Sequence, residues 1–181
     1  MLISSIFVCS FSAFSQTSLH YWDFNNGLSG IPWATPVAAT QTSGVGSLSH
    51  PFGCNTDAFA GSTQDAPGFT TATAGASFSV VSSASNGQAF TLSVPTTGYS
   101  GIKYTYSTRG TGTGFTTHTI DYSTDGISYT NIATITGRTA TTFSLQTVDF
   151  TAITAADNNP DFKIRVTVSG ATGTVISVPI Q

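Results

Sequence analysis

Apolar and polar positions alternate with a period of two along much of this chain. Between residues 117 and 123, His118, Ile120 and Tyr122 alternate with Thr and Asp, which predicts a half-buried strand. Thr124-Asp125-Gly126 follows and predicts a tight turn, because Asp bonds its own backbone and Gly accepts a positive φ. The alternation returns with a slip between residues 129 and 135, which indicates a β-bulge. The pattern therefore predicts a central hairpin over residues 115–135.

The same period predicts strands elsewhere. We expect them at residues 19–24, 76–80, 89–94, 99–109, 143–150, 161–168 and 173–180. The segment 28–69 is rich in Gly, Pro, Ser and Thr and is weakly patterned, with short strands expected near 46–50 and 58–61. No segment has helical periodicity beyond one turn. Many short strands separated by turn signals predict an all-β fold, an antiparallel β-sandwich.

Composition agrees with a sheet protein. Charged residues make up 7% of the chain, against about 25% in ordinary soluble domains. Thr and Ser fill the polar positions, every acidic residue is Asp, and good helix formers are scarce, which favours strands. The net charge of −3 and the lack of any Lys or Arg cluster argue against a nucleic-acid partner.

The first fifteen residues form an apolar run that ends in Ala13-Phe14-Ser15. This pattern predicts a signal peptide cleaved before Gln16, and hence a secreted or cell-surface protein whose domain covers residues 16–181. The usual basic start is missing, so the leader is read as incomplete, and a buried first strand is the alternative. The run is too short for a membrane span, which needs about 20 apolar residues.

Without the leader, Cys54 is the single cysteine of the chain. It cannot form an internal disulfide. We predict a small buried side chain at this position, and a thiol linked to a partner protein is the alternative.

Three stretches carry a family resemblance: Tyr122–Tyr129, Asn158–Val166 and His20–Asn25, together with the Ala-Phe-Ser-Gln end of the leader. They resemble galactose-binding-like jelly-roll modules, which recur in secreted multidomain proteins of Bacteroidetes-type bacteria. The resemblance covers about residues 19–169 and rests on turn and strand patterns. It implies a jelly-roll topology and an accessory, carbohydrate-binding or adhesive role.

The end of the chain departs from that family. Its members usually close with an Arg-x-Asp-Asn strand, whereas residues 173–180 read Gly-Thr-Val-Ile-Ser-Val-Pro-Ile. We therefore consider the chain truncated, or part of a larger cell-surface protein.

Sugar-binding modules place an exposed aromatic plane against the apolar face of a pyranose, beside polar groups that orient it. Trp33, in an irregular Pro-rich stretch, and Tyr99, at a strand start, are the candidate platforms. Arg109 is one of only five basic residues and can present its planar fork to a sugar or a carboxylate. The alternatives are that both aromatics pack over the ends of the sandwich and that Arg109 forms an ion pair with an Asp.

The one cofactor that the sequence suggests is a structural calcium ion. Calcium takes six to eight oxygen ligands, and Asp23, Asn25 and Asn26 supply such oxygens directly after the first predicted strand. In the related jelly rolls calcium is structural. Asp149, Asp157 or Asp161 could add a ligand from the far end of the chain. Plain turn chemistry is the alternative.

Catalytic patterns are weak. The three histidines, His20, His50 and His118, are not accompanied by a Gly-x-Ser-x-Gly elbow, and His118 is expected in the core. Asp121 and Asp125 are the closest carboxylate pair for glycoside hydrolysis, but a turn role explains Asp125. Gly110–Gly114 joins two strands, unlike a phosphate loop.

The sequence thus predicts a non-catalytic module that binds a glycan or another cell-surface polymer. A structural spacer or interaction domain without a small ligand is one alternative, and a small polysaccharide-active enzyme is the other.

Overall fold

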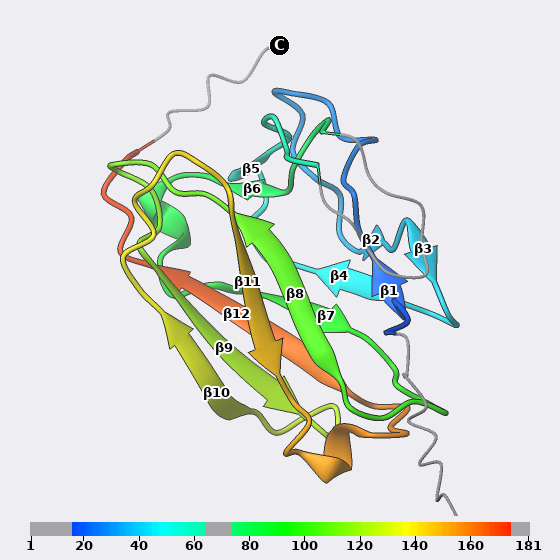
Figure 1. Ribbon diagram of the computed structural model, residues 1–181. Helices are drawn as coiled ribbons and strands as arrows, with labels where there is room; N and C mark the ends of the chain where they lie inside the picture. The colour runs from blue at the N-terminus through cyan, green and yellow to red at the C-terminus, as the bar shows by residue number, and fades with distance from the viewer. Residues whose placement is uncertain (1–15, 64–73, 175–181) are drawn as a thin grey trace, which may run out of the picture.

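The computed structural model describes residues 16–63 and 74–174 and shows an all-β chain (Figure 1). The longer strands are β7 (Ala89–Ser93), β8 (Lys103–Thr108), β9 (Thr117–Ser123), β10 (Thr130–Ile135), β11 (Ser144–Asp149) and β12 (Lys163–Ser169). The short ones are β1 (His20–Tyr21), β2 (Val37–Ala38), β3 (Gln41–Thr42), β4 (Ser47–Ser49), β5 (Thr56–Asp57) and β6 (Ser79–Val80). Two single 3₁₀ turns, η1 (Ser83–Ser85) and η2 (Thr154–Ala156), complete the described elements.

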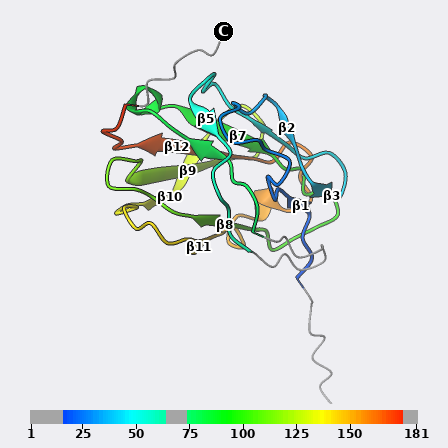
Figure 2. The ribbon, with the colours of Figure 1, turned by 90° about the horizontal axis from the view of Figure 1, so that it is seen from above.

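The strands form two unequal layers. The larger is an antiparallel six-stranded sheet in the order β10-β9-β12-β7-β4-β2, and the ribbon of β8 and β11 faces it from the other side. Viewed from above, this ribbon lies apart from the sheet that contains β9 and β12 (Figure 2). The pairs β1–β3 and β5–β6 form two further small sheets. The arrangement is sandwich-like, with one layer much narrower than the other.

The predicted central hairpin is confirmed. β9 pairs antiparallel with β10, and the register shifts between Asn131 and Ala133, which is the expected bulge. At the turn, the Asp125 carboxylate accepts the backbone N–H groups of Ile127 and Ser128 at 2.8 and 2.7 Å. These bonds hold the pKa of Asp125 well below its usual range. Gly126 has φ +74°, as the turn requires.

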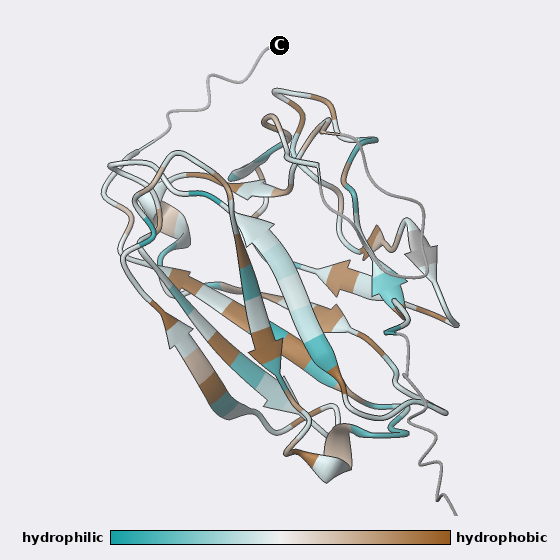
Figure 3. Ribbon diagram, in the orientation of Figure 1, coloured by the Kyte–Doolittle hydropathy of each residue, from teal (hydrophilic) through white to brown (hydrophobic). Residues whose placement is uncertain are grey.

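The inward faces of β12 and β7 supply much of the core. Ile164, Val166 and Val168 alternate with half-buried polar residues along β12. Coloured by hydropathy, β12 and β9 show this alternation as banded arrows (Figure 3). Phe150 and Phe162, which flank the strands, meet edge to face at 5.3 Å between ring centroids. Burial of one alternating face is what a half-solvated antiparallel strand requires.

Several elements differ from the prediction. The first strand was expected to run to Phe24, but β1 ends at Tyr21 and Phe24 takes φ +56°, which breaks extended geometry. In the strand predicted at residues 143–150, Leu145 is 60% exposed although its side chain is apolar. It alternates out of phase with Val148, which is buried opposite Tyr104.

Two predicted segments lie largely outside the described residues, namely the leader at residues 1–15 and the last strand beyond Thr174. Among the residues that are described, no helix has the length and apolar character to cross a membrane.

Candidate functional site

The loop between β1 and β2 folds back on itself through local hydrogen bonds. Gly27 N–H donates to the Phe24 carbonyl at 3.1 Å, and Ile31 N–H donates to the Leu28 carbonyl at 3.0 Å. Gly30 N–H donates to the Asp57 carboxylate at 2.8 Å. The last bond ties the tip of the loop to β5, so the loop has a defined shape although it is irregular.

This loop presents Trp33. The Trp33 backbone N–H donates to Thr56 Oγ1 at 2.7 Å, and its indole Nε1–H donates to the Asp57 carbonyl at 3.1 Å. The ring meets Phe24 edge to face at 5.5 Å and lies 6.4 Å from Phe78. The indole is therefore fixed on one side by apolar packing and along its edge by β5, and the residue remains half-buried.

A small pocket opens beside this ring. Its volume is about 200 Å³, and it is lined by Asn26, Gly27, Leu28, Ile31, Pro32, Trp33 and Ala34. None of these side chains is ionisable. Leu28 is 68% and Ile31 is 58% exposed, so the pocket has apolar side chains that are accessible to a ligand. We call these seven residues the Trp33 pocket.

The structure separates the three predicted ligand-binding residues. Tyr99 is 38% exposed and its hydroxyl lies 3.2 Å from Ser43 Oγ. The Arg109 guanidinium lies over the Phe143 ring, 5.4 Å from its centroid. Tyr99 and Arg109 stand before and after β8 and do not line the Trp33 pocket. Of the three, Trp33 alone contributes to that pocket.

The residues predicted to bind calcium have other contacts. Asp23 Oδ1 accepts Asn25 N–H and the Thr40 hydroxyl, both at 3.0 Å. Asn25 Oδ1 accepts Ala76 N–H at 3.0 Å, and Asn26 lines the Trp33 pocket. Asn25 and Asn26 are exposed. No group of three His, Cys or Asp side chains within the described ranges is placed to hold a metal ion. A calcium ion at this turn stays a prediction.

A second cavity of about 1380 Å³ runs along β8 between the layers. Its walls are β8 and the segments around residues 16–24 and 76–82, and inward residues of the large sheet, including Phe90 and Leu92, form its floor. We call it the interlayer crevice. Its volume exceeds the roughly 300–1,000 Å³ of typical ligand sites.

Tyr106 and His118 meet in this crevice. The Tyr106 hydroxyl lies 3.1 Å from His118 Nδ1. Burial, with the nearby Arg138 charge adding to it, lowers the pKa of His118 to about 4. Burial raises the pKa of Tyr106 to about 12 and also raises that of Tyr104, which stacks on Tyr106 at 5.0 Å. All three side chains are therefore neutral near pH 7, and His118 faces the interlayer crevice, as the alternation predicts, but is half-buried and not part of the core.

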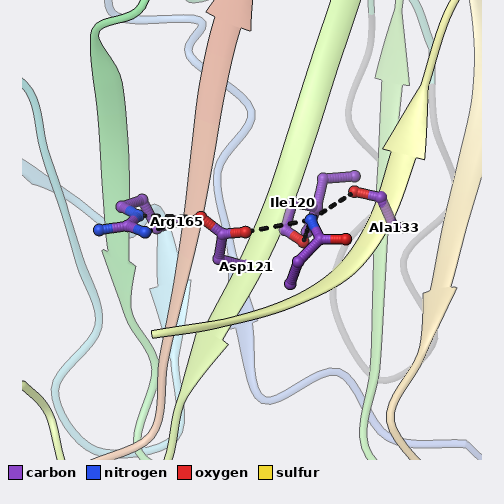
Figure 4. A network of polar contacts seen from close by, with 5 residues as sticks. Ile120, Asp121, Ala133 and Arg165 are labelled. Carbon is purple, nitrogen blue, oxygen red and sulfur yellow. Dashed lines mark hydrogen bonds and ion pairs between the residues drawn. The ribbon is translucent and has the colours of Figure 1, made fainter. Parts of the chain in front are cut away.

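The carboxylates considered for hydrolysis have structural partners. Arg165 donates to Asp121 Oδ2 through Nε and Nη2, at 3.1 and 2.7 Å. Asn131 bridges Asp121 to the carbonyls of Ile120 and Ala133 (Figure 4). These bonds lie on the polar outer face of the large sheet, and Asp125 is held by the hairpin turn.

The prediction for Cys54 was wrong, because its thiol is exposed rather than buried. It lies in the tight turn of residues 52–55, where Asn55 N–H donates to the Phe52 carbonyl at 3.0 Å. In this turn Phe52 takes the buried place and Cys54 faces outward.

Sequence reasoning missed the partners of Trp33 in its pocket. The available signal was the pair of large apolar residues, Leu28 and Ile31, inside a Gly- and Pro-rich loop, where such residues are not needed for a turn. Comparison of the chain with protein-family models, with curated proteins and with solved structures found no match.

Proposed function

We propose that this chain is a secreted, non-catalytic module that binds a neutral sugar unit of a glycan against Trp33. The observation that supports this most directly is the open pocket of about 200 Å³ beside a half-buried indole. The indole edge is held by the Asp57 carbonyl. A fixed aromatic plane of this kind binds a ligand at little entropic cost.

The chemistry of the Trp33 pocket favours a sugar over other small ligands. A pyranose has an apolar face that packs on an aromatic ring and hydroxyl groups that need polar partners. Ile31 and Pro32 provide apolar walls, and the exposed Asn26 amide at the rim can both donate and accept hydrogen bonds. Because no lining residue is ionisable, a charged sugar would lose hydration without gaining a partner.

The wider setting of the proposal rests on the sequence. The apolar run that ends at Ser15 supports export, and the resemblance of the strand and turn patterns supports a jelly-roll topology. A module that binds a glycan outside the cell can attach its parent protein to a polysaccharide or a cell surface, which is the adhesive role.

The chain offers a matched test, because it contains two tryptophans. Trp22 packs against the core and donates its indole N–H to the Val37 carbonyl at 3.3 Å, away from the Trp33 pocket. The full chain is titrated with galactose, glucose, mannose, xylose and N-acetylglucosamine while tryptophan fluorescence is recorded. We expect a saturable change with at least one sugar in the wild type and in Trp22→Phe, and none in Trp33→Phe.

Calorimetry with the same sugars checks the result without relying on fluorescence. If no sugar gives saturable heat or fluorescence, or if the signal survives in Trp33→Phe, the proposed function is rejected. The absence of any response would favour a spacer or interaction domain without a small ligand, whereas a response that survives in Trp33→Phe would place sugar binding outside the Trp33 pocket.

A further inference from the structure

Two Asn-Gly pairs occur in the sequence, Asn26-Gly27 and Asn86-Gly87. The first lies on the rim of the Trp33 pocket, and the second directly follows η1. Both asparagines are exposed. Because the two pairs consist of the same residues, a difference in their reactivity in the folded protein comes from the structure around them.

An asparagine in this context can lose its side-chain amide without an enzyme. The backbone nitrogen of the next residue attacks Cγ, and the new C–N bond closes a succinimide ring. The side-chain nitrogen leaves as ammonia and takes the proton of the backbone N–H with it. Water then opens the ring at either carbonyl and gives aspartate or iso-aspartate. Glycine in the second place favours this reaction, because it has no Cβ and lets the backbone rotate freely.

The Asn86 side chain is held on both sides. Its Nδ2 donates to the Ala171 carbonyl at 2.8 Å, and its Oδ1 accepts the Ala171 N–H at 2.9 Å. The nitrogen that would attack is also engaged, because Gly87 N–H donates to the Val168 carbonyl of β12 at 2.8 Å. Three hydrogen bonds between distant parts of the chain must therefore break before Asn86 can cyclise.

The Asn26 amide has no such anchor. Within residues 16–63 and 74–174, no hydrogen bond holds its side chain. The attacking nitrogen is engaged there only locally, since Gly27 N–H donates to the Phe24 carbonyl at 3.1 Å. This bond closes a short turn, so cyclisation at Asn26 requires a local opening and no separation of distant segments.

We propose that Asn26 deamidates through the Gly27 nitrogen in the folded protein and that the product no longer binds a neutral sugar in the Trp33 pocket. The second part rests on the proposed function. No residue that lines the pocket is ionisable, so the new carboxylate, which is charged at neutral pH, has no cationic partner among them. It also lacks the two N–H donors that the amide offers to a hydroxyl group.

Iso-aspartate brings a second change, because it inserts the side-chain methylene into the main chain directly before Gly27. A Cβ on Gly27 would lie 2.6 Å from Trp33 Cη2, so the loop already passes close to the indole. A longer backbone at this point displaces the loop or the ring. The added charge and the longer backbone thus act in the same direction, against a bound sugar.

Ageing the full chain in a mildly alkaline buffer tests the first part without any sugar. Chymotryptic peptides are fragmented in a mass spectrometer, which assigns the modification to single asparagines. We expect Asn26 to deamidate about ten times faster than Asn86 in the folded protein, because of the three bonds that hold the Asn86 pair. In urea the two rates should be similar. The proposal is overturned if Asn26 reacts no faster than Asn86 while the chain is folded.

The aged sample also provides the test of the second part. Anion-exchange chromatography separates molecules that carry the additional charge from molecules that do not. The fraction modified at Asn26 should lose the tryptophan fluorescence response to the sugar that the fresh protein binds. The unmodified fraction has the same history and should keep the response.

The two parts fail in different ways. An undiminished response in the fraction modified at Asn26 overturns the second part. If the fresh protein binds no sugar at all, the proposed function is rejected and the second part with it. The comparison of rates at Asn26 and Asn86 decides the first part in either case.

Discussion

At the scale of single residues, Gly27 decides the shape of the candidate site. A Cβ at this position would lie 2.6 Å from Trp33 Cη2 and 2.7 Å from Ala58 Cβ. Both distances are well inside van der Waals contact, so only glycine lets the loop pass this close to the indole. The half-buried position of Trp33 therefore depends on its neighbour in the loop as much as on its own hydrogen bonds.

We predict that Gly27→Ala displaces the indole and closes or distorts the Trp33 pocket. Forcing an extra methyl group into a packed position costs about 1–3 kcal/mol, measurable by denaturant unfolding. Any sugar response of tryptophan fluorescence should disappear. Gly30→Ala is the control, because Gly30 has φ +78° and open space around it. It should cost about 1 kcal/mol of stability through backbone strain and leave the sugar response unchanged. Equal loss of the response in both variants would contradict this role of Gly27.

At the scale of elements, the outer face of the large sheet is held by one charged network. Arg165 on β12 pairs with Asp121 on β9, and its guanidinium lies over the Tyr129 ring at 4.0 Å. Asp121 is 8% exposed, so Arg165 replaces much of the water that its carboxylate loses on burial. The Asn131 amide, at the bulge of β10, donates to the same carboxylate at 3.1 Å. Three neighbouring strands are thus linked on the face opposite the core.

We predict that Arg165→Met destabilises the protein by about 2 kcal/mol, because it leaves a nearly buried carboxylate without its cation. This value is below the usual cost of breaking a buried pair, since the Arg165 side chain is 37% exposed. The double variant Asp121→Leu/Arg165→Met should recover much of the loss, as it leaves no unpaired charge. Urea unfolding of the two variants and the wild type measures both effects. A double variant less stable than Arg165→Met would show that packing, and not charge, dominates.

At the scale of the whole molecule, the two layers are joined by the hydrogen bond between Tyr106 on β8 and His118 on β9. The pKa of His118 falls from 6.5 to about 4 on folding, because burial disfavours its charged form and Arg138 repels it. The unfolded chain therefore binds more protons than the folded chain between these two values. The contribution of neutral His118 to the free energy of unfolding is fully present above pH 6.5 and is lost as the pH falls toward 4.

We predict that the free energy of unfolding decreases by up to about 3 kcal/mol as the pH falls from 6.5 to 4 through this group alone. His50, whose pKa burial also lowers, adds a change of the same sign. In His118→Gln the slope of stability against pH in this window should become clearly shallower. Urea unfolding at half-unit pH steps measures it. An unchanged slope would mean that His118 remains accessible to protons in the folded state.

How far the fold could be predicted differs between segments. The period is unambiguous in β7, β9 and β12, and the structure has strands at all three places. In β10 the alternation slips at the bulge, and the turn before it indicated the strand. The described part of the weakly patterned segment 28–69, residues 28–63, contains strands of only two or three residues, too short for any period to be visible. The prediction for Cys54 failed because it rested on the average burial of cysteine. In this turn Phe52 points inward, and Cys54 is exposed.

The candidate site could be predicted in part. Trp33 was identified from its type and setting, but its pocket is made by contacts with Phe24, Asp57 and Phe78. Tyr99 and Arg109 were grouped with it by chemical type, whereas the chain places them before and after β8, away from the Trp33 pocket.

The order of side chains along β7, β9 and β12 followed from the sequence alone, because the alternation of faces is a local property of an extended backbone. The same holds for the hairpin turn at Asp125-Gly126 and its bulge. Only the tertiary structure decided that the second layer is narrow, that a crevice lies beside β8 and that Trp33 opens onto a pocket. Those features depend on segments tens of residues apart that meet through packing, and no local pattern records which distant surfaces will come into contact.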